Sequence, residues 1–288
     1  MARKVWIEVA LNGMWGKAAQ PNIPVTVDEV IADGIACINA GAAILHLHAI
    51  DPVTGKQNDD PDIYEAIFRG IRAKTDGIVY PTMPLDLYPG WTDRYQSADE
   101  LGRRGLLEWA VVDPGSLNIS AVDAASKQLR GKGVVYVNTD AEIRRGMQLA
   151  AKYNFHPEYA CFEPGFVRLG AAMHRAYPDT PAPIYSFRFA EELTLGLPPT
   201  EWALETYVRL LEIEAPGAHW MAASMGGDIT PLIPAIVARG GGVRTGLEDA
   251  PMGSRKTNAD LVKECVRAVR AAGGEPATGG DVRAELKR

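Results

Sequence analysis

The feature that most constrains the fold is the regular alternation of short β-rich runs with helical segments along nearly the whole chain. The predicted strands are Val5–Leu11, Ala43–His48, Ile78–Thr82, Trp109–Val112, Val134–Asn138, Tyr159–Phe162, Ile184–Phe189, Trp220–Ala223 and Val243–Leu247. The predicted helices between them include Thr26–Ala40, Asp60–Lys74, Ala141–Tyr153, Thr200–Glu214 and Asn258–Ala272. This alternation predicts a parallel sheet with right-handed crossovers.

The number of strand candidates is one more than a closed eight-stranded barrel needs. Val134–Asn138 follows an irregular stretch, so we interpret it as an excursion between the fourth and fifth barrel strands. An open doubly wound sheet would favour a G-x-G-x-x-G loop after the first strand, whereas residues 12–16 read Asn-Gly-Met-Trp-Gly. No shift in composition divides the 288 residues. We therefore predict a single-domain (β/α)8 TIM barrel over residues 1–288, with its catalytic face built from the βα loops.

Composition excludes several classes of protein. The net charge of −6 argues against a partner that is a nucleic acid. No apolar run approaches the roughly 18 residues that span a bilayer, so we expect no membrane partner. The first residues lack the apolar core of a secretory signal. Cys37, Cys161 and Cys265 are widely spaced, which is typical of buried thiols in a reducing compartment, so we expect a cytoplasmic protein.

The strongest chemical signal is a pair of histidines within the predicted strand Ala43–His48. Side chains alternate along a strand, so His46 and His48 share one face, while Leu45 and Leu47 share the other. In a barrel, the leucines would pack against the helices and both imidazoles would face the lumen. Two imidazoles at this spacing can bind one metal ion, and burying them without a partner is costly.

A third ligand is expected near the end of the last predicted strand. The other histidines have no ligand spacing: His156, His174 and His219. The eighth strand of a barrel is separated from the second only by the first, so Glu248 or Asp249 could reach the metal. On an extended strand, Arg244 would share a face with Gly246 and Glu248.

Taken together, these segments resemble the β-keto acid cleavage enzyme family over essentially the full length. The matching pieces are Pro24-Val25-Thr26, residues 40–48, Asp51-Pro52-Val53-Thr54-Gly55, Pro157-Glu158, residues 161–165, residues 240–249, residues 254–262, Pro276-Ala277-Thr278 and Ala284-Glu285-Leu286. The H-x-H pair followed by R-x-G-x-E-D is the specific part of this pattern. The resemblance implies a (β/α)8 barrel that forms a homo-oligomer, either a dimer or a tetramer.

The resemblance also implies a reaction and the residues that perform it. His46, His48 and Glu248 would bind a divalent metal ion, typically Zn²⁺. Asp249 would be the general base, oriented by Arg244, and Thr82 would help to bind the carboxylate of the substrate. A β-keto acid and acetyl-CoA would give acetoacetate and a new acyl-CoA.

The chain departs from the family pattern in the loops that set specificity. The departures are Ile50 in place of an arginine, no acid in residues 12–17, residues 83–91 in place of a Thr-Gly-Gly-like loop, Val111 in place of a polar residue, and residues 225–228 in place of a basic Gly-x-Gly-Arg pattern. They predict a substrate other than an amino-ketoacid. Met14 and Trp15 would contact it. With Tyr88 and Trp91 they could form an apolar pocket or a cage for a quaternary ammonium group such as that of dehydrocarnitine.

Other functions remain open from the residues alone. A metal-dependent hydrolase would also begin with H-x-H, but commonly adds further histidines. A lyase that acts without CoA transfer needs the same metal and base. A barrel that binds a ligand without turnover is the non-catalytic alternative. Two imidazoles and a carboxylate would also accept Co²⁺, Mn²⁺ or Fe²⁺.

Overall fold

The computed structural model describes residues 2–84, 93–123 and 125–287, and it confirms the predicted barrel. Eight parallel strands follow the order β4-β3-β2-β11-β10-β9-β8-β5. Their bounds are β2 (Ile7–Ala10), β3 (Ile44–Leu47), β4 (Ile78–Pro81), β5 (Trp109–Val111), β8 (His156–Cys161), β9 (Ile184–Ala190), β10 (Trp220–Met225) and β11 (Gly242–Thr245). Tyr80 of β4 packs on Trp109 of β5, with ring centroids 5.8 Å apart, so the two ends of the sheet meet and nearly close the barrel.

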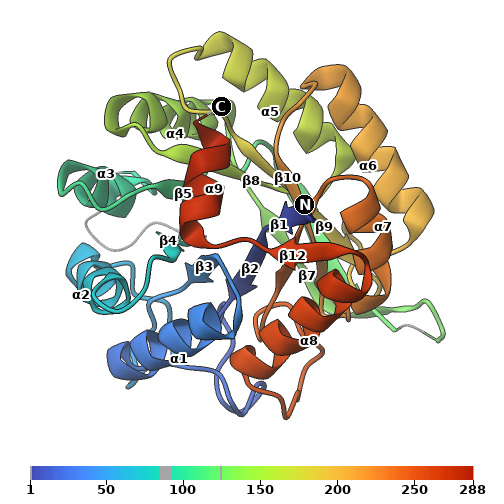
Figure 1. Ribbon diagram of the computed structural model, residues 1–288, viewed down its shortest axis with the longest axis horizontal. Coiled ribbons are helices and arrows are strands. Elements are labelled where there is room, and N and C mark those ends of the chain that lie inside the picture. Colours follow the sequence, from blue (N-terminus) through green and yellow to red (C-terminus); the bar gives the residue numbers. More distant parts are fainter. Residues whose placement is uncertain (1, 85–92, 124, 288) are drawn as a thin grey trace.

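Helices surround the barrel as a ring (Figure 1). They are α1 (Val27–Ala40), α2 (Pro61–Arg72), α3 (Gln96–Arg103), α4 (Asp140–Tyr153), α5 (Pro164–Ala176), α6 (Glu201–Glu214), α7 (Ile233–Ala238), preceded by the 3₁₀ turn η1 (Thr230–Leu232), and α8 (Asn258–Ala271). A capping box begins α1, because Thr26 and Glu29 bond to each other's backbone N–H groups. No helix within the described residues has both the length and the apolar character to cross a membrane.

The predicted excursion between the fourth and fifth barrel strands is a β-hairpin. Its strands β6 (Leu117–Val122) and β7 (Leu129–Tyr136) pair antiparallel and project away from the ring of helices (Figure 1). The Tyr136 hydroxyl donates to Asp113 Oδ2 at 2.6 Å and fixes the base of the hairpin to the barrel. The interpretation that Val134–Asn138 is not a barrel strand is therefore confirmed.

The predicted strand Val5–Leu11 is two strands, which corrects the sequence prediction. β1 (Arg3–Val5) pairs in parallel with β12 (Gly274–Pro276), outside the barrel sheet, and only β2 enters the barrel. Trp6 separates them, and its indole N–H donates to Glu285 of α9 (Gly279–Leu286) at 2.8 Å. β1, β12 and α9 together cover the end of the barrel at which its strands begin (Figure 1).

Candidate metal centre

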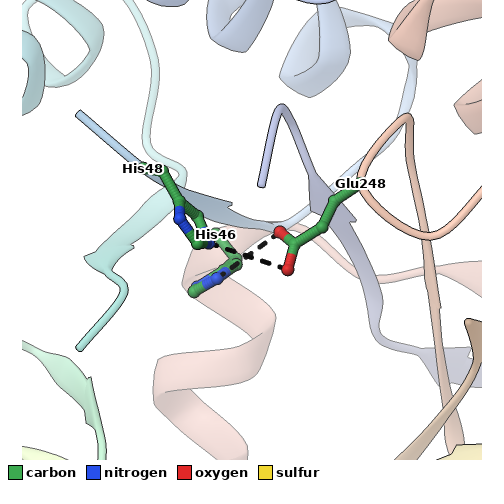
Figure 2. Close-up of side chains that lie close together, drawn as sticks. All are labelled: His46, His48 and Glu248. Carbon is green, nitrogen blue, oxygen red and sulfur yellow. Dashed lines mark ion pairs between the residues drawn. The ribbon is translucent and has the colours of Figure 1, made fainter. Parts of the chain in front are cut away.

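His46 of β3 (Ile44–Leu47), His48 directly after this strand, and Glu248 from the loop after β11 converge in the barrel (Figure 2). Nε2 of His46 lies 3.6 Å from Oε2 of Glu248, and Nε2 of His48 lies 3.7 Å from Oε1 of the same side chain. One potential ligand atom from each residue lies within 4.8 Å of the others. Two ligand atoms of a tetrahedral zinc ion are about 3.3 Å apart, so this spacing suits a cation between the three groups.

Buried polar atoms without hydrogen-bond partners support the same interpretation. His48 Nε2 and Glu248 Oε2 are buried, and neither has a partner among the described residues. Most buried polar atoms in proteins are satisfied, and leaving one unpaired costs about 1–3 kcal/mol. A bound cation would satisfy both atoms. The donor set of two imidazoles and one carboxylate fits a catalytic zinc site that keeps a position open for substrate.

A chain of hydrogen bonds orients His48. Its Nδ1 lies 2.9 Å from Oε1 of Gln57, and the Gln57 amide nitrogen donates to Asp59 at 2.8 Å. The Tyr64 hydroxyl donates to the same carboxylate at 2.8 Å. Because an amide oxygen only accepts, the proton of His48 sits on Nδ1. This leaves the lone pair of Nε2 directed into the site, as metal-binding histidines require.

The side chain of Leu45, in β3, faces the surrounding helices, as predicted. Its Cδ1 lies so near Gly34 of α1 that a side chain on that glycine would come within 3.1 Å of it. His46 instead lies inside the barrel, with its ring centroid 4.8 Å from that of Tyr80. Burial holds the pKa of His46 well below its ordinary value, against the opposing charge of Glu248, so the imidazole is neutral and able to bind a metal.

Glu248 reaches the site from a turn, which corrects the predicted strand Val243–Leu247. β11 ends at Thr245, and Gly246 has a φ of 128°. A Cβ at Gly246 would come within 2.2 Å of the Ala10 carbonyl oxygen, so only glycine allows β11 to approach β2 here. Arg244 contacts Glu248 across this turn, and not by sharing the face of an extended strand.

Arg244 organises the carboxylates around it. Its Nε and Nη2 donate to Oδ2 and Oδ1 of Asp249 at 2.7 and 3.1 Å, a two-point contact between buried groups. Nη2 also lies 3.1 Å from Oε1 of Glu248, and Nη1 donates to Glu8 at 3.1 Å. Burial would raise the pKa of Glu248, but the charge of Arg244 outweighs it and leaves that pKa well below its ordinary value. Glu248 is therefore ionised at neutral pH.

The three residues predicted to contact the substrate, Met14, Trp15 and Thr82, differ from one another in burial and in hydrogen bonding. Trp15 donates from its indole nitrogen to the backbone oxygen of Glu248 at 2.9 Å, so it steadies the glutamate's loop. Gly13 beside it has a positive φ of 59°, and a Cβ there would meet Glu248 Cγ at 2.5 Å. Met14 is 48% exposed. Thr82 is half-buried directly after β4, with its backbone N–H bonded to Leu47 at 3.0 Å. The suggested cage residues Tyr88 and Trp91 lie outside the described residues.

A buried charge network in the barrel interior was missed from the sequence. Glu8 accepts a hydrogen bond from the Tyr80 hydroxyl at 2.8 Å, and Arg188 Nη2 donates to Glu158 Oε1 at 2.9 Å. Burial raises the pKa of Glu158 to about 8, although Arg188 opposes the shift. The available signal was a charged residue inside an apolar strand, as in Ile7-Glu8-Val9, because charged side chains are rarely fully buried unless paired.

Together, the fold and the histidine–glutamate cluster define a barrel with a candidate metal centre where its strands end. The chain belongs to the β-keto acid cleavage enzyme family, whose model matches residues 4–287. The resemblance stated from the sequence is thus confirmed, and with it the prediction that the chain belongs to a family of enzymes.

Relatives of known name match this chain over nearly its full length. It is 26% identical to the 3-dehydrocarnitine:acetyl-CoA trimethylamine transferase of Rhizobium meliloti (strain 1021), covering 100% of this chain and 97% of the relative. It is 27% identical to the 3-oxoadipate:acetyl-CoA acetyltransferase of Cupriavidus necator, and the match covers 99% of this chain and 95% of the relative. A solved complex of ObcA with oxaloacetate has a TM-score of 0.73 at 16% identity, covering 94% of this chain and 68% of that one. That likeness supports the barrel fold.

Proposed function

We propose that this chain exchanges acyl groups between a β-keto acid and acetyl-CoA, giving acetoacetate and a new acyl-CoA. The observation that carries the proposal is the cluster of His46, His48 and Glu248, joined through Arg244 to Asp249. Family membership supports the class of reaction. The names of two relatives, both of which specify acetyl-CoA, support the second substrate.

The side chains of the site have distinct roles in this proposal. A divalent ion held by His46, His48 and Glu248 would act as a Lewis acid toward the keto oxygen. Asp249 removes a proton from the carbon between the two carbonyl groups of the substrate. Arg244 fixes the orientation of Asp249 through both carboxylate oxygens. Thr82, after β4, binds the substrate carboxylate.

The overall exchange balances without a redox cofactor. The acyl group of the keto acid leaves its carbon and becomes bonded to the sulfur of CoA. The acetyl group leaves that sulfur and becomes bonded to the carbon, which completes acetoacetate. The proton taken by Asp249 is returned to the product.

The loop after β2 supports a substrate other than an amino-ketoacid, because it offers no carboxylate to pair with a primary ammonium group. Residues 12–17 contain no acid, and the Asn12 side chain is already used within the protein. Its amide nitrogen donates to the carbonyl oxygens of Pro24 and His48, at 3.2 and 2.8 Å. Its oxygen accepts from the His48 backbone at 2.9 Å. Asn12 thus holds the strand that carries the histidines. Met14, in the same loop, remains a proposed substrate contact together with Trp15.

We further propose that the ion is Zn²⁺, that the protein is cytoplasmic, and that one catalytic domain spans residues 1–288. The imidazole and carboxylate donors support zinc. Three free, buried cysteines support a reducing compartment. The family resemblance supports a homodimer or homotetramer.

The test is mass spectrometry of CoA thioesters after zinc-loaded protein is incubated with acetyl-CoA and a panel of β-keto acids. We expect a new acyl-CoA together with acetoacetate, and its mass identifies the substrate. Asp249→Asn should slow formation of the product by at least about a hundredfold, while Asp179→Asn, at an exposed site, should not slow it. Loss of keto acid without a new thioester would replace the proposal with a lyase. No reaction with any keto acid would overturn it.

A further inference from the structure

A cavity of about 280 Å³ lies between the loops that follow β10 and β11. Its lining includes the buried side chains of Arg244 and Asp249 and, toward solvent, the exposed Met252, Gly253 and Lys256. The cavity thus extends from the protein surface to the proposed base. The three proposed metal ligands are not among the residues that line it.

The walls of this cavity are mostly uncharged and of mixed polarity. Apolar contacts come from Ile229, Ala250, Pro251 and Leu261. Hydroxyl groups come from Ser224, Thr230 and Thr245. Ser224 is 2% exposed, and its Oγ has no hydrogen-bond partner among the described residues. A buried hydroxyl without a partner in a cavity wall indicates that a polar ligand group completes it.

Apart from Arg244 and Asp249, the charged residues that line the cavity are the cation Lys256 and the acids Asp228 and Glu264. Lys256 is about half exposed, and its ammonium group pairs with Glu264, which also lines the cavity, at 2.6 Å. Exposed ion pairs of this kind contribute little to stability, so the lysine can exchange its partner for a ligand anion at small cost. Loops after the seventh and eighth strands of a barrel frequently bind ligand phosphates.

We infer that this cavity binds the pantetheine arm of acetyl-CoA, with the thioester beside Asp249 and the phosphates near Lys256. This inference rests on the proposed function. The arm is uncharged and combines two amides with a dimethyl group, which matches walls that alternate hydroxyl and apolar groups. The keto acid at the metal site and the thioester in the cavity would then lie next to each other, because Arg244 lines the cavity and its Nη2 lies 3.1 Å from both Glu248 Oε1 and Asp249 Oδ1.

Two variants at the mouth of the cavity test the inference. Lys256→Glu replaces the cation with an anion, and Met252→Trp narrows the entrance at a side chain that is 49% exposed. Each should raise the KM for acetyl-CoA about tenfold, a factor that corresponds to about 1.4 kcal/mol, while the KM for the keto acid stays unchanged. Acetyl-pantetheine, which lacks the phosphates, distinguishes the effects of the two variants. Met252→Trp should still raise the KM for acetyl-pantetheine, and Lys256→Glu should not.

Matched controls keep the result specific. Lys263→Glu makes the same charge change on α8 at a residue that does not line the cavity, and Leu169→Trp adds the same ring on the surface of α5. Both should leave the KM for acetyl-CoA unchanged. If Lys256→Glu and Met252→Trp also leave it unchanged in an enzyme that consumes acetyl-CoA, the inference is wrong and the proposed function stands. If the wild-type protein neither consumes acetyl-CoA nor binds CoA by calorimetry, both fail.

Discussion

The two ends of the barrel solve the problem of buried polar groups in different ways. At the end where the strands begin, the Trp6 indole is paired with Glu285, and its ring lies on Trp109 with centroids 5.9 Å apart. At the other end, His48 Nε2, Glu248 Oε2 and Ser224 Oγ are buried without partners among the described residues. At the first end, the indole has its partner within the protein. At the second, the three unpaired atoms would be satisfied by ligands in the proposed function, so we expect substitutions at the first end to affect stability and substitutions at the second to affect activity.

The strongest test of the difference between the two ends of the barrel is a substitution at Asp249. Asp249→Asn keeps the shape of the side chain but removes the base, so we expect kcat to fall by about 10²- to 10⁴-fold. Zinc affinity should change little, because the metal cluster does not include this residue, whereas the melting temperature should fall, because buried Arg244 loses an ionic partner. Steady-state kinetics and equilibrium dialysis provide the two measurements. A fall of less than tenfold would remove Asp249 from its proposed role.

At the end where the strands begin, truncation of a buried side chain should lower the stability of the protein and leave its catalytic activity intact. Trp6 is 4% exposed, and Trp6→Ala removes a large buried side chain, which costs about 3–5 kcal/mol of unfolding free energy. Urea denaturation measures the loss. We expect kcat per folded molecule to match that of the wild type below the transition. A parallel fall in kcat would show that the two ends are not separate.

The dependence of stability on pH provides a further test, which depends on the buried carboxyl group of Glu158. Burial raises the pKa of this carboxyl to about 8 in the folded protein, above its ordinary value of 4.5. Between these values the unfolded chain releases a proton that the folded protein retains. The free energy of unfolding should therefore fall as pH rises toward 8, by up to about 1.4 kcal/mol per pH unit, and be unaffected below the lower value.

Glu158→Gln removes that proton release. Its stability should decline less steeply than that of the wild type when urea denaturation is followed across this pH range. Glu285→Gln, at the surface of the opposite end, controls for the exchange of an acid for an amide. Equal slopes for the wild type and Glu158→Gln would contradict the raised pKa.

The smallest effect on stability is expected at Glu285, on the surface of the end where the barrel strands begin. Glu285→Ala removes the acceptor of the Trp6 indole, but Glu285 is 43% exposed on its side chain, so water can replace part of the contact. We expect a loss of about 0.5–1.5 kcal/mol of unfolding free energy. Chemical denaturation would detect it, and activity should not change. A loss as large as that for Trp6→Ala would mean that the hydrogen bond, and not the ring, holds this end together.

The sequence predicts the barrel because its fold depends on local patterns. Alternation of strands and helices is visible within short windows, and the capping box of Thr26 and Glu29 marks the start of α1. The histidine pair was equally visible, since a spacing of two residues fixes the face of a strand. Local patterns do not show that Trp6 divides the first strand, because β1 is held by pairing with residues 274–276.

The interior network required information that no short window contains. Arg244 and Glu8 are 236 positions apart in the chain, and their contact depends on the adjacent placement of β11 and β2. The end of β11 was also misplaced, because the φ of 128° at Gly246 reflects the approach of the Ala10 backbone. Arg188 gave only a weak signal, as a single charge between Phe187 and Phe189.

The place of β2 between β3 and β11 determines when the site can form during synthesis. His46 and His48 leave the ribosome early, as part of residues 44–48, whereas Glu248 follows 200 positions after His48. Pairing across so long a segment makes barrel closure a late folding event. Under the proposed function, a nascent chain therefore cannot hold a metal ion with all three ligands until nearly all of it has been made.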